Sequence, residues 1–269
     1  MAKELFYNVP LGLILVASIG FFLLATEAGF LLGRRSQSAV DEPSKSQIFA
    51  IQGAILGLLA LLLGFAYAMA TFRYDARKQF LLEEANAIGK TFLLAQLLPE
   101  PPRKEVSNLL RRYVEVRLDA GNDANALRKV GDETERLHKQ LWLDGAAVAE
   151  KDPGGFASVV TTGLFLESLN EMIDLNLTRI TTLENHVPEV TLMLLFFIAF
   201  MGTALIGYGC GLSGVRNFFL TIISSVLIAA VIMVIIDFDR PTKGFITISM
   251  QPTIDLQNSL KEWDSLKVQ

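Results

Sequence analysis

The chain contains four runs of mostly apolar residues, and this feature restricts its fold more than any other. The runs cover roughly residues 11–32, 49–72, 189–212 and 218–236. A helix needs about 20 such residues to cross about 30 Å of hydrocarbon. A spanning segment must be helical, because lipid offers no partners to backbone amides and carbonyls. With 51% apolar residues and a mean hydropathy of +0.40, the composition favours an all-α, polytopic membrane protein with four transmembrane helices.

The order of the runs predicts four parts of the chain. Residues 1–72 form a first transmembrane hairpin, and residues 73–187 form a water-exposed helical domain that continues from the second span. Residues 188–236 form a second transmembrane hairpin, and residues 237–269 form a C-terminal tail. The first run is longer than the apolar core of a signal peptide, which is about 7–15 residues, and no A-x-A pattern follows it. We therefore expect the first span to be retained.

The basic residues near the span ends predict the orientation. An even number of spans places both termini and the helical domain on one side of the membrane. That side carries seven basic residues near the spans and the two loops carry four, so we expect the termini and the domain to be cytoplasmic. The pair that directly follows the first span argues against this orientation. The seven are Lys3, Arg73, Arg77, Lys78, Arg179, Arg240 and Lys243, and the four are Arg34, Arg35, Lys45 and Arg216.

Apolar residues at helical spacing predict a bundle in the water-exposed domain. No helix breaker stands between Gln47 and Leu98, so span two is expected to continue as one rod of about 50 residues, about 75 Å long. Further helices are expected over roughly residues 103–120, 124–149 and 156–185. Residues 245–250 alternate and are expected to be extended. The apolar face of the rod beyond the membrane is formed by Leu81, Ala85, Ile88, Phe92 and Ala95.

The residues that catalysis, metal binding or nucleic-acid binding would need are missing from the sequence. The net charge of −4 does not fit the basic surface of a nucleic-acid binder. Cys210 is the single cysteine, so no intramolecular disulfide can form. His138 and His186 have no partner at metal-ligand spacing, and neither a Walker loop nor a Gly-x-Ser-x-Gly elbow occurs. We expect no enzymatic activity, no metal or other cofactor, and no nucleic-acid partner; the expected surroundings are the lipid bilayer.

Two spans carry small residues along one face, which lets helix backbones approach closely in lipid. On span three the small residues recur at every fourth position. Packing within one subunit is the expected role of both faces, and a subunit interface or the wall of a pore is the alternative. The span-two set is Gly53, Gly57, Ala60, Gly64, Ala68 and Thr71, and the span-three set is Ala199, Thr203, Gly207 and Gly211.

Two polar residues lie within the apolar register. Glu27 is in span one, where a buried carboxylate costs about 2 to 3 kcal/mol unless it is paired or hydrated. It is therefore either a functional residue or near enough to the interface to reach water or Arg34. Gln52 opens span two and is expected to be its neighbour at the same level.

Charged residues gather where spans two and four end on the same side of the membrane. Three cations and one carboxylate after span two face two carboxylates and one cation after span four. We expect ion pairs that fix the two helix ends, with a direct role in ion passage as the alternative. The cluster consists of Arg73, Asp75, Arg77, Lys78, Asp237, Asp239 and Arg240.

Several stretches resemble a family of bacterial and plant four-span membrane proteins that is described as bestrophin-like. The resemblance extends from span one to the tail, and its most specific part is Glu83-Glu84-Ala85-Asn86-Ala87-Ile88-Gly89. The other stretches are Phe72-Arg73-Tyr74-Asp75-Ala76-Arg77-Lys78, Leu97-Leu98-Pro99, Leu110-Arg111-Arg112-Tyr113 and Asp237-Phe238-Asp239-Arg240-Pro241 with Gly244.

The resemblance implies a ring-shaped homo-oligomer, with a pentamer as the first expectation. Span two would line a central anion pathway and continue into a cytoplasmic vestibule. Span-two aromatic residues, among them Phe72, are candidates for its constrictions. A family found in bacteria also implies the inner (plasma) membrane as the location. The leading hypothesis is thus an oligomeric ion channel that conducts inorganic anions such as chloride, although a ring of Glu27 carboxylates would favour cations.

A second hypothesis belongs to a different class of protein. The charged helices at roughly residues 103–150 are also typical of a non-conducting membrane scaffold or sensor, whose helical domain binds a partner while the spans anchor it. A hydrated symmetric opening bounded by span two would favour conduction. Tightly sealed spans and a docked soluble protein would favour the scaffold.

Overall fold

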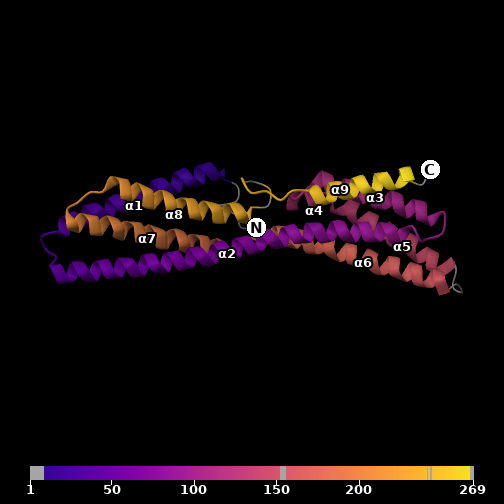
Figure 1. The fold of residues 1–269 in the computed structure, drawn as a ribbon, viewed down its shortest axis with the longest axis horizontal. Coiled ribbons are helices and arrows are strands. Elements are labelled where there is room, and N and C mark those ends of the chain that lie inside the picture. Colours follow the sequence, from indigo (N-terminus) through magenta and orange to yellow (C-terminus); the bar gives the residue numbers. More distant parts are fainter. Residues whose placement is uncertain (1–8, 152–155, 241, 243, 267–269) are drawn as a thin grey trace. The chain divides into compact units, whose positions relative to one another are not determined.

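The computed structural model describes residues 9–151, 156–240, 242 and 244–266, and their regular secondary structure is entirely α-helical (Figure 1). The helices are α1 (Leu11–Ser36), α2 (Glu42–Ala95), α3 (Pro102–Ala120), α4 (Ala124–Lys129), α5 (Gly131–Lys151), α6 (Phe156–Glu184), α7 (Glu189–Ser213), α8 (Phe218–Asp239) and α9 (Gln251–Leu266). The predicted all-α class is confirmed. The single long helix expected from span two is also present, because α2 runs for 54 residues without a break.

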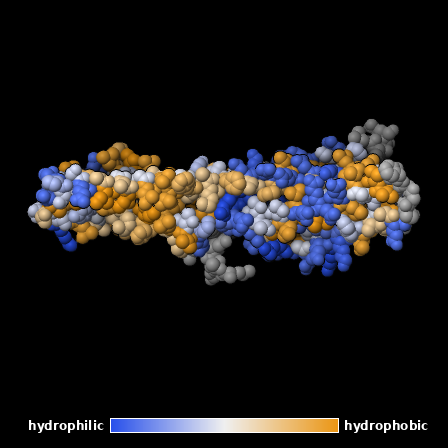
Figure 2. All heavy atoms as spheres, turned by 90° about the horizontal axis from the view of Figure 1, so that it is seen from below, coloured by the Kyte–Doolittle hydropathy of each residue, from blue (hydrophilic) through white to orange (hydrophobic). Residues whose placement is uncertain are grey.

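Contacts between residues divide the chain into two compact units. The membrane unit comprises the described residues up to Arg73 together with His186–Ile246, and the bundle unit comprises Tyr74–Asn185 and the described residues from Thr247 onward. Four segments of the described chain are long and apolar enough to cross a membrane. They are Leu11–Ser36, Glu42–Ala95, Phe218–Asp239 and Val159–Ser213, the last of which includes most of α6 and all of α7. Hydrophobic side chains cover most of the visible surface of the membrane unit, whereas hydrophilic ones are frequent on the bundle unit (Figure 2).

In the membrane unit, glycines let α1 and α7 pack backbone against backbone. A Cβ atom on Gly207 would collide with the carbonyl of Thr26, and one on Gly211 would collide with the carbonyl of Phe30. Glycines on α1 meet backbone atoms of α7 in the same way. Dispersion contacts at such short range hold helices together where lipid supplies no hydrophobic drive. The small-residue face of span three therefore packs within one subunit, as predicted.

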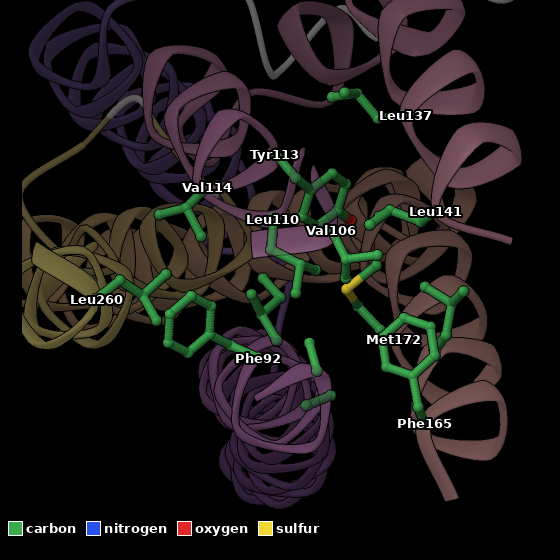
Figure 3. Packing of buried hydrophobic residues seen from close by; sticks show 14 of the residues in the cluster. Phe92, Val106, Leu110, Tyr113, Val114, Leu137, Leu141, Phe165, Met172 and Leu260 are labelled. Atoms are coloured by element: carbon green, nitrogen blue, oxygen red, sulfur yellow. The ribbon is translucent and has the colours of Figure 1, made fainter. Parts of the chain in front are cut away.

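The bundle unit has a core to which α2, α3, α5, α6 and α9 all contribute (Figure 3). Leu110 and Tyr113 of α3 are fully buried in it, in the same cluster as the buried rings of Phe92 of α2 and Phe165 of α6. The apolar face predicted for the continuation of span two is buried, and its residues Ile88, Phe92 and Ala95 belong to this core. Burial of one face of each helix explains why the polar part of the chain folds outside the hydrocarbon.

Helix α9 lies in the C-terminal tail, for which the sequence analysis predicted no helix. Its residues Leu256, Leu260 and Trp263 follow one another at intervals of four and three, and they pack on the bundle core. The Trp263 ring meets the Phe92 ring edge-on, with 6.3 Å between the centroids. The spacing could have revealed this helix, but its 16 residues carry few large apolar side chains.

Two further details differ from the prediction. The helix expected over residues 124–149 is two helices, and Val130 ends the first of them. The break lets Leu127 join a small cluster with Ala120 and Leu183, while Leu137 enters the main core. The expected extended stretch at 245–250 is irregular and belongs to no strand, because its backbone meets side chains instead of a partner strand: the carbonyl of Ile248 accepts a bond of 2.8 Å from Nδ2 of Asn122.

Candidate functional site

The small-residue face of α2 is open in the single chain. Gly53, Gly57, Ala60, Gly64 and Ala68 are all exposed. A Cβ atom built on any of the three glycines would have no atom within 4 Å. Packing within one subunit, the role we expected first, therefore does not account for this face, in contrast to the equivalent face of α7.

The opposite side of α2 attaches the helix to its own unit. Leu59, Ala66 and Ala70 are buried there. Leu56 and Leu59 lie over Gly202 of α7, the Leu56 side chain 3.2 Å from the place of a Cβ atom. Only 6% of the most apolar window of α2 is buried inside the chain, against 33% for α1. Among the spans, α2 thus has the least contact with its own subunit.

Aromatic side chains lie next to the open face of α2 and just beyond its end in the sequence. Phe72 is 75% exposed and Phe65 is 62% exposed. Tyr67 is partly covered by the edge of the Phe238 ring of α8, with 5.7 Å between the centroids. Phe72, the predicted aromatic candidate, is therefore largely uncovered by its own chain where the open face ends.

Glu27 is paired, and its partner is not the one that we considered. Its Oε2 accepts a bond of 2.5 Å from Nη2 of Arg216, in the turn between α7 and α8. Both side chains are a little under half exposed. Arg34 had been the candidate because it is close in sequence, but Arg216 comes near only when α7 and α8 pack against α1. Gln52 does not bond to Glu27; its Oε1 lies against α7, 2.9 Å from where a Cβ of Gly209 would be.

On α2, the charged residues that follow the span have separate surroundings. Asp75 and Lys78 are exposed, and Nη2 of Arg73 lies 3.7 Å from the sulfur of Met69. Arg77 is buried and donates to the carbonyls of Thr182 at 3.3 Å and Asn185 at 2.6 Å. These carbonyls end α6, where a cation is favourable because it meets the negative end of the helix dipole.

The carboxylates at the end of α8 bind backbone amides of the membrane unit. Asp237 accepts from the amides of Phe245 at 3.0 Å and Ile246 at 3.2 Å. Asp239 accepts from the amide of Val187 at 2.7 Å, just before α7. Arg240 is buried beside them. Asp75, Arg77 and Lys78 belong to the bundle unit, whereas the end of α8 belongs to the membrane unit. The ion pairs predicted between the two helix ends therefore remain a prediction.

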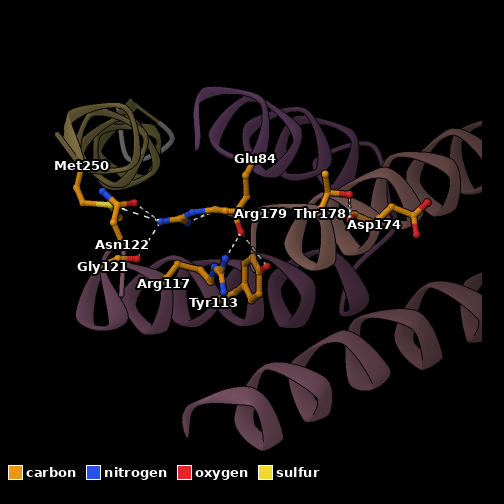
Figure 4. A network of polar contacts seen from close by, with 9 residues as sticks. All are labelled: Glu84, Tyr113, Arg117, Gly121, Asn122, Asp174, Thr178, Arg179 and Met250. Atoms are coloured by element: carbon orange, nitrogen blue, oxygen red, sulfur yellow. Dashed lines mark hydrogen bonds and ion pairs between the residues drawn. The ribbon is translucent and has the colours of Figure 1, made fainter. Parts of the chain in front are cut away.

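A buried charge cluster in the bundle unit was not foreseen from the sequence (Figure 4). The Glu84 carboxylate of α2 lies between two arginines: Oε1 is 2.7 Å from Nη2 of Arg117 on α3, and Oε2 accepts from Nη1 of Arg179 on α6. Arg179 also donates to the carbonyl of Gly121 and to Oδ1 of Asn122, both at 2.9 Å. One carboxylate thus joins three helices that are far apart in sequence.

The sequence contained a signal for this charge cluster. Glu84 falls on the same helix face as Leu81 and Ile88, and Arg117 falls on the face of Leu110 and Tyr113. A charged residue on an apolar face is expected to be paired, because burial of an isolated charge is costly. The pairing itself could not be read from the sequence.

Burial also shifts the pKa of two neutral neighbours of the charge cluster. Burial, and next the charge of Glu84, raise the pKa of the Tyr113 phenol well above its usual value. Burial, and next the charge of Arg117, lower the pKa of His138 to about 4. Both groups are neutral at pH 7, so two arginines and one carboxylate carry the charge of the cluster. No group of three or more metal-ligating side chains occurs within the described residues.

The bestrophin-like domain model matches residues 19–253, which include most of the first span, the other three spans, the open face of α2 and the buried charge cluster. The chain belongs to the bestrophin-like family. No curated protein matches the sequence. As a bestrophin-like protein with four spanning helices, the chain is an integral membrane protein.

Solved structures share the fold of this bestrophin-like chain. A crystal structure of a bacterial bestrophin homologue from Klebsiella pneumoniae has a TM-score of 0.67 at 13% identity, with 93% of this chain and 97% of that chain covered. A second crystal structure of a homologue from this organism, with one substitution, has a TM-score of 0.65 at 14% identity, with 92% and 96% covered. At this identity the likeness shows the fold alone.

Proposed function

We propose that the chain assembles into a symmetric homo-oligomer whose α2 helices surround a central pathway for inorganic anions, with chloride as the first candidate. The observation that carries the proposal is the open face of α2, which is apolar, lined by small residues and not covered by its own subunit. Small residues allow α2 helices of several subunits to stand close together and still leave an opening. The implied ring of subunits, a pentamer by resemblance, would supply the missing neighbours.

The distribution of carboxylates supports anions. Between Pro43 and Tyr74 the sequence of α2 contains no Asp or Glu, so this stretch offers no carboxylate ring to a pathway. Glu27, which had been a reason to expect cations, is on α1 and is neutralised by Arg216. Rings of carboxylates select cations, whereas a lining without them leaves anions admitted.

Charged-reagent access to cysteines on α2 tests this proposal. In a Cys210→Ser background, Ala60→Cys and Ala68→Cys place thiols on the open face, and Ala66→Cys and Ala70→Cys place them on the buried face of the same helix. We expect a negatively charged methanethiosulfonate reagent to change the current of reconstituted protein for the first pair and not for the second. Unmodified protein that passes no current under any gradient, or equal effects on both pairs, would contradict the proposal.

The orientation proposed from the basic residues has the termini and the bundle unit in the cytoplasm of a bacterium, with the spans in its inner membrane. In the same Cys210→Ser background, a cysteine at Asp119, which is exposed on α3, and one at Ser38, in the α1–α2 loop, report the two sides. A membrane-impermeant maleimide added to whole cells should label the second cysteine only. Labelling of the first would reverse the orientation.

One observation favours the alternative of a partner-binding scaffold. A groove of about 900 Å³ runs along the bundle unit between α2, α6 and α9. Its wall includes the exposed side chains of Leu82, Leu93 and Leu164. Exposed apolar surface of this kind marks an interaction site on soluble domains. Absence of current, together with a soluble protein that crosslinks to this groove in cells, would establish the scaffold instead.

A further inference from the structure

A second cavity lies in the membrane unit, away from the open face of α2. It has a volume of about 460 Å³ and is bounded by α1, α7 and the start of α8. Its walls are mainly apolar, with Leu23 and Leu24 of α1 facing Phe218 and Ile222 of α8. Its charged groups are Glu27 and Arg216, and its uncharged polar residues are Thr26, Asn217 and Thr221. The cavity therefore combines an apolar slot with one positive and one negative charge.

The geometry of the ion pair leaves part of each charged group available to a ligand. The hydrogen bond joins Oε2 of Glu27 to Nη2 of Arg216, so the second carboxylate oxygen and the remaining guanidinium donors are not used in this bond. The guanidinium carbon lies 4.1 Å from the centre of the Phe218 ring and 5.1 Å from that of Phe30. These cation–π contacts hold Arg216 in place, while both side chains of the pair stay a little under half exposed.

The position of the cavity at one end of the spans indicates the level where polar lipid groups meet the hydrocarbon. Helix α7 ends at Ser213 and α8 begins at Phe218, with Arg216 in the turn between them. Arginine and aromatic rings at such a turn are typical of the membrane–water interface. Leu24 and Ile222 are exposed on the apolar surface next to it, so the slot is open to lipid chains.

We propose that this cavity binds one phospholipid with a primary ammonium headgroup, of the phosphatidylethanolamine class. Its phosphate contacts Arg216, because a guanidinium binds phosphate oxygens through several charge-assisted hydrogen bonds. Its ammonium contacts Glu27, whose free oxygen accepts N–H bonds. An acyl chain occupies the slot between Leu23, Leu24 and Ile222. The site is independent of conduction through α2, which involves another face of the membrane unit.

The two charges predict which lipids are discriminated. An anionic phosphatidylglycerol brings a phosphate to Arg216 but no ammonium to the second carboxylate oxygen of Glu27. A phosphatidylcholine satisfies the charges, but its quaternary ammonium has no N–H to donate to the carboxylate. Charge-assisted hydrogen bonds to both residues are thus complete only with the primary ammonium lipid.

Lipid titration followed by native mass spectrometry tests the proposal on the purified full chain in detergent. We expect one dioleoylphosphatidylethanolamine per chain, bound about tenfold more tightly than dioleoylphosphatidylglycerol or dioleoylphosphatidylcholine. Arg216→Gln should weaken all three phospholipids, and Glu27→Gln should remove only the preference for phosphatidylethanolamine. Arg34→Gln, a matched change of an exposed arginine outside the cavity at the end of α1, should change nothing. Equal binding of the three lipids by the unmodified chain, or equal behaviour of the three variants, would overturn the proposal.

The natural cysteine gives a second measurement that needs no substitution. Cys210 is the only cysteine of the chain and lines this cavity. Bound phosphatidylethanolamine should slow the reaction of Cys210 with N-ethylmaleimide severalfold, and phosphatidylglycerol at the same concentration should slow it less. If phosphatidylethanolamine binds but the rate of labelling is unchanged, the lipid occupies another place and the assignment of this cavity is wrong. Because it uses the unmodified chain, this measurement tests the proposal even if a variant fails to fold.

Discussion

Glu84 and Arg179 form an ion pair in which each side chain is 2% exposed, although 95 positions separate them in the chain. With Arg117 as the second partner of Glu84, the pair joins α2, α3 and α6 inside the bundle unit. A buried ion pair contributes little net stability compared with apolar residues, but loss of one partner is costly. The charge cluster therefore makes the packing of these helices sensitive to single substitutions.

Replacement of Glu84 by Gln should destabilise the protein strongly. The change leaves the guanidinium groups of Arg117 and Arg179 buried without a counter-charge, which should lower the free energy of unfolding by about 3–5 kcal/mol. Glu83→Gln is the matched control, because the neighbouring carboxylate bonds to Gln79 in an exposed pair. Thermal unfolding of the purified chain measures both. Equal midpoints for the two variants would contradict the importance assigned to the charge cluster.

Replacement of Gly207 by Ala should separate α1 from α7. The added Cβ would fall on the backbone of Thr26, which cannot move aside as a flexible side chain could. Overpacking of this kind costs about 1–3 kcal/mol. Gly12→Ala on α1 adds the same methyl group where no atom lies within 4 Å. We expect lower resistance to heat in detergent for the first variant only, and a loss of similar size in both would exclude close packing as the cause.

The stability of the bundle unit should fall as the pH drops from about 6.5 to about 4. The folded-state pKa of His138 is lowered to about 4 by burial and by the charge of Arg117. In this interval the unfolded chain binds a proton that the folded chain does not, so the contribution of His138 is complete above the unfolded pKa and is lost as the pH falls. Arg117, Glu84 and Tyr113 are the groups of the charge cluster near the ring.

Unfolding midpoints measured across this pH range test the role of His138. The variant His138→Asn should reduce the slope of stability against pH, since the new side chain does not titrate. The neighbouring exposed change Lys139→Gln alters a charge without removing the ring, and the slope should persist. Identical slopes for the unmodified chain and His138→Asn would assign the pH dependence to other groups.

Replacement of Leu260 by Ala should loosen α9. Leu260 is 4% exposed and belongs to the bundle core, and a Leu→Ala change in such a place costs about 2–5 kcal/mol. Ile254→Ala on the same helix removes an apolar side chain that is 39% exposed, so a much smaller cost is expected. Protease digestion of the folded chain should cut near α9 faster in the first variant. Equal rates would show that the docking of α9 does not depend on this side chain.

Replacement of Ala60 by Glu should shift the ion preference of reconstituted protein toward cations. In the proposed oligomer the change places a ring of carboxylates on the pathway, and such rings attract cations and repel anions. Ala60→Gln has nearly the same size without the charge and should keep the original preference. Reversal potentials under a salt gradient measure the difference. No shift with Glu would place residue 60 away from the pathway.

The helices could be predicted where the local sequence pattern was strong. They were harder to predict where contacts with distant parts of the chain decide the bounds of a helix. The four spans and the long α2 follow from runs of apolar residues that need no knowledge of neighbours. The break at Val130 and the docking of α9 depend on which cluster receives Leu127 and on the covering of Phe92 by Trp263. Neither contact can be predicted from the local sequence, so one helix was predicted too long and the other was missed.

For the candidate site, the sequence identified the small residues on two spans but could not tell their roles apart. Both faces consist of Gly, Ala and Thr at intervals of three or four, yet Gly207 meets the backbone of α1 and Gly57 meets nothing in its own chain. Likewise, Glu27 stood out as a carboxylate in an apolar span, while its partner Arg216 lies 189 positions away.

By itself, the sequence determined that the chain crosses a bilayer with helices, because lipid forces each apolar run to satisfy its own backbone. It also determined which faces of the helices are apolar, since that depends only on spacing along the chain. Only the tertiary structure decided which face of α2 remains open, which arginine neutralises Glu27, and how Glu84 is buried between Arg117 and Arg179. Those outcomes depend on groups from separate helices that meet only when the chain has packed.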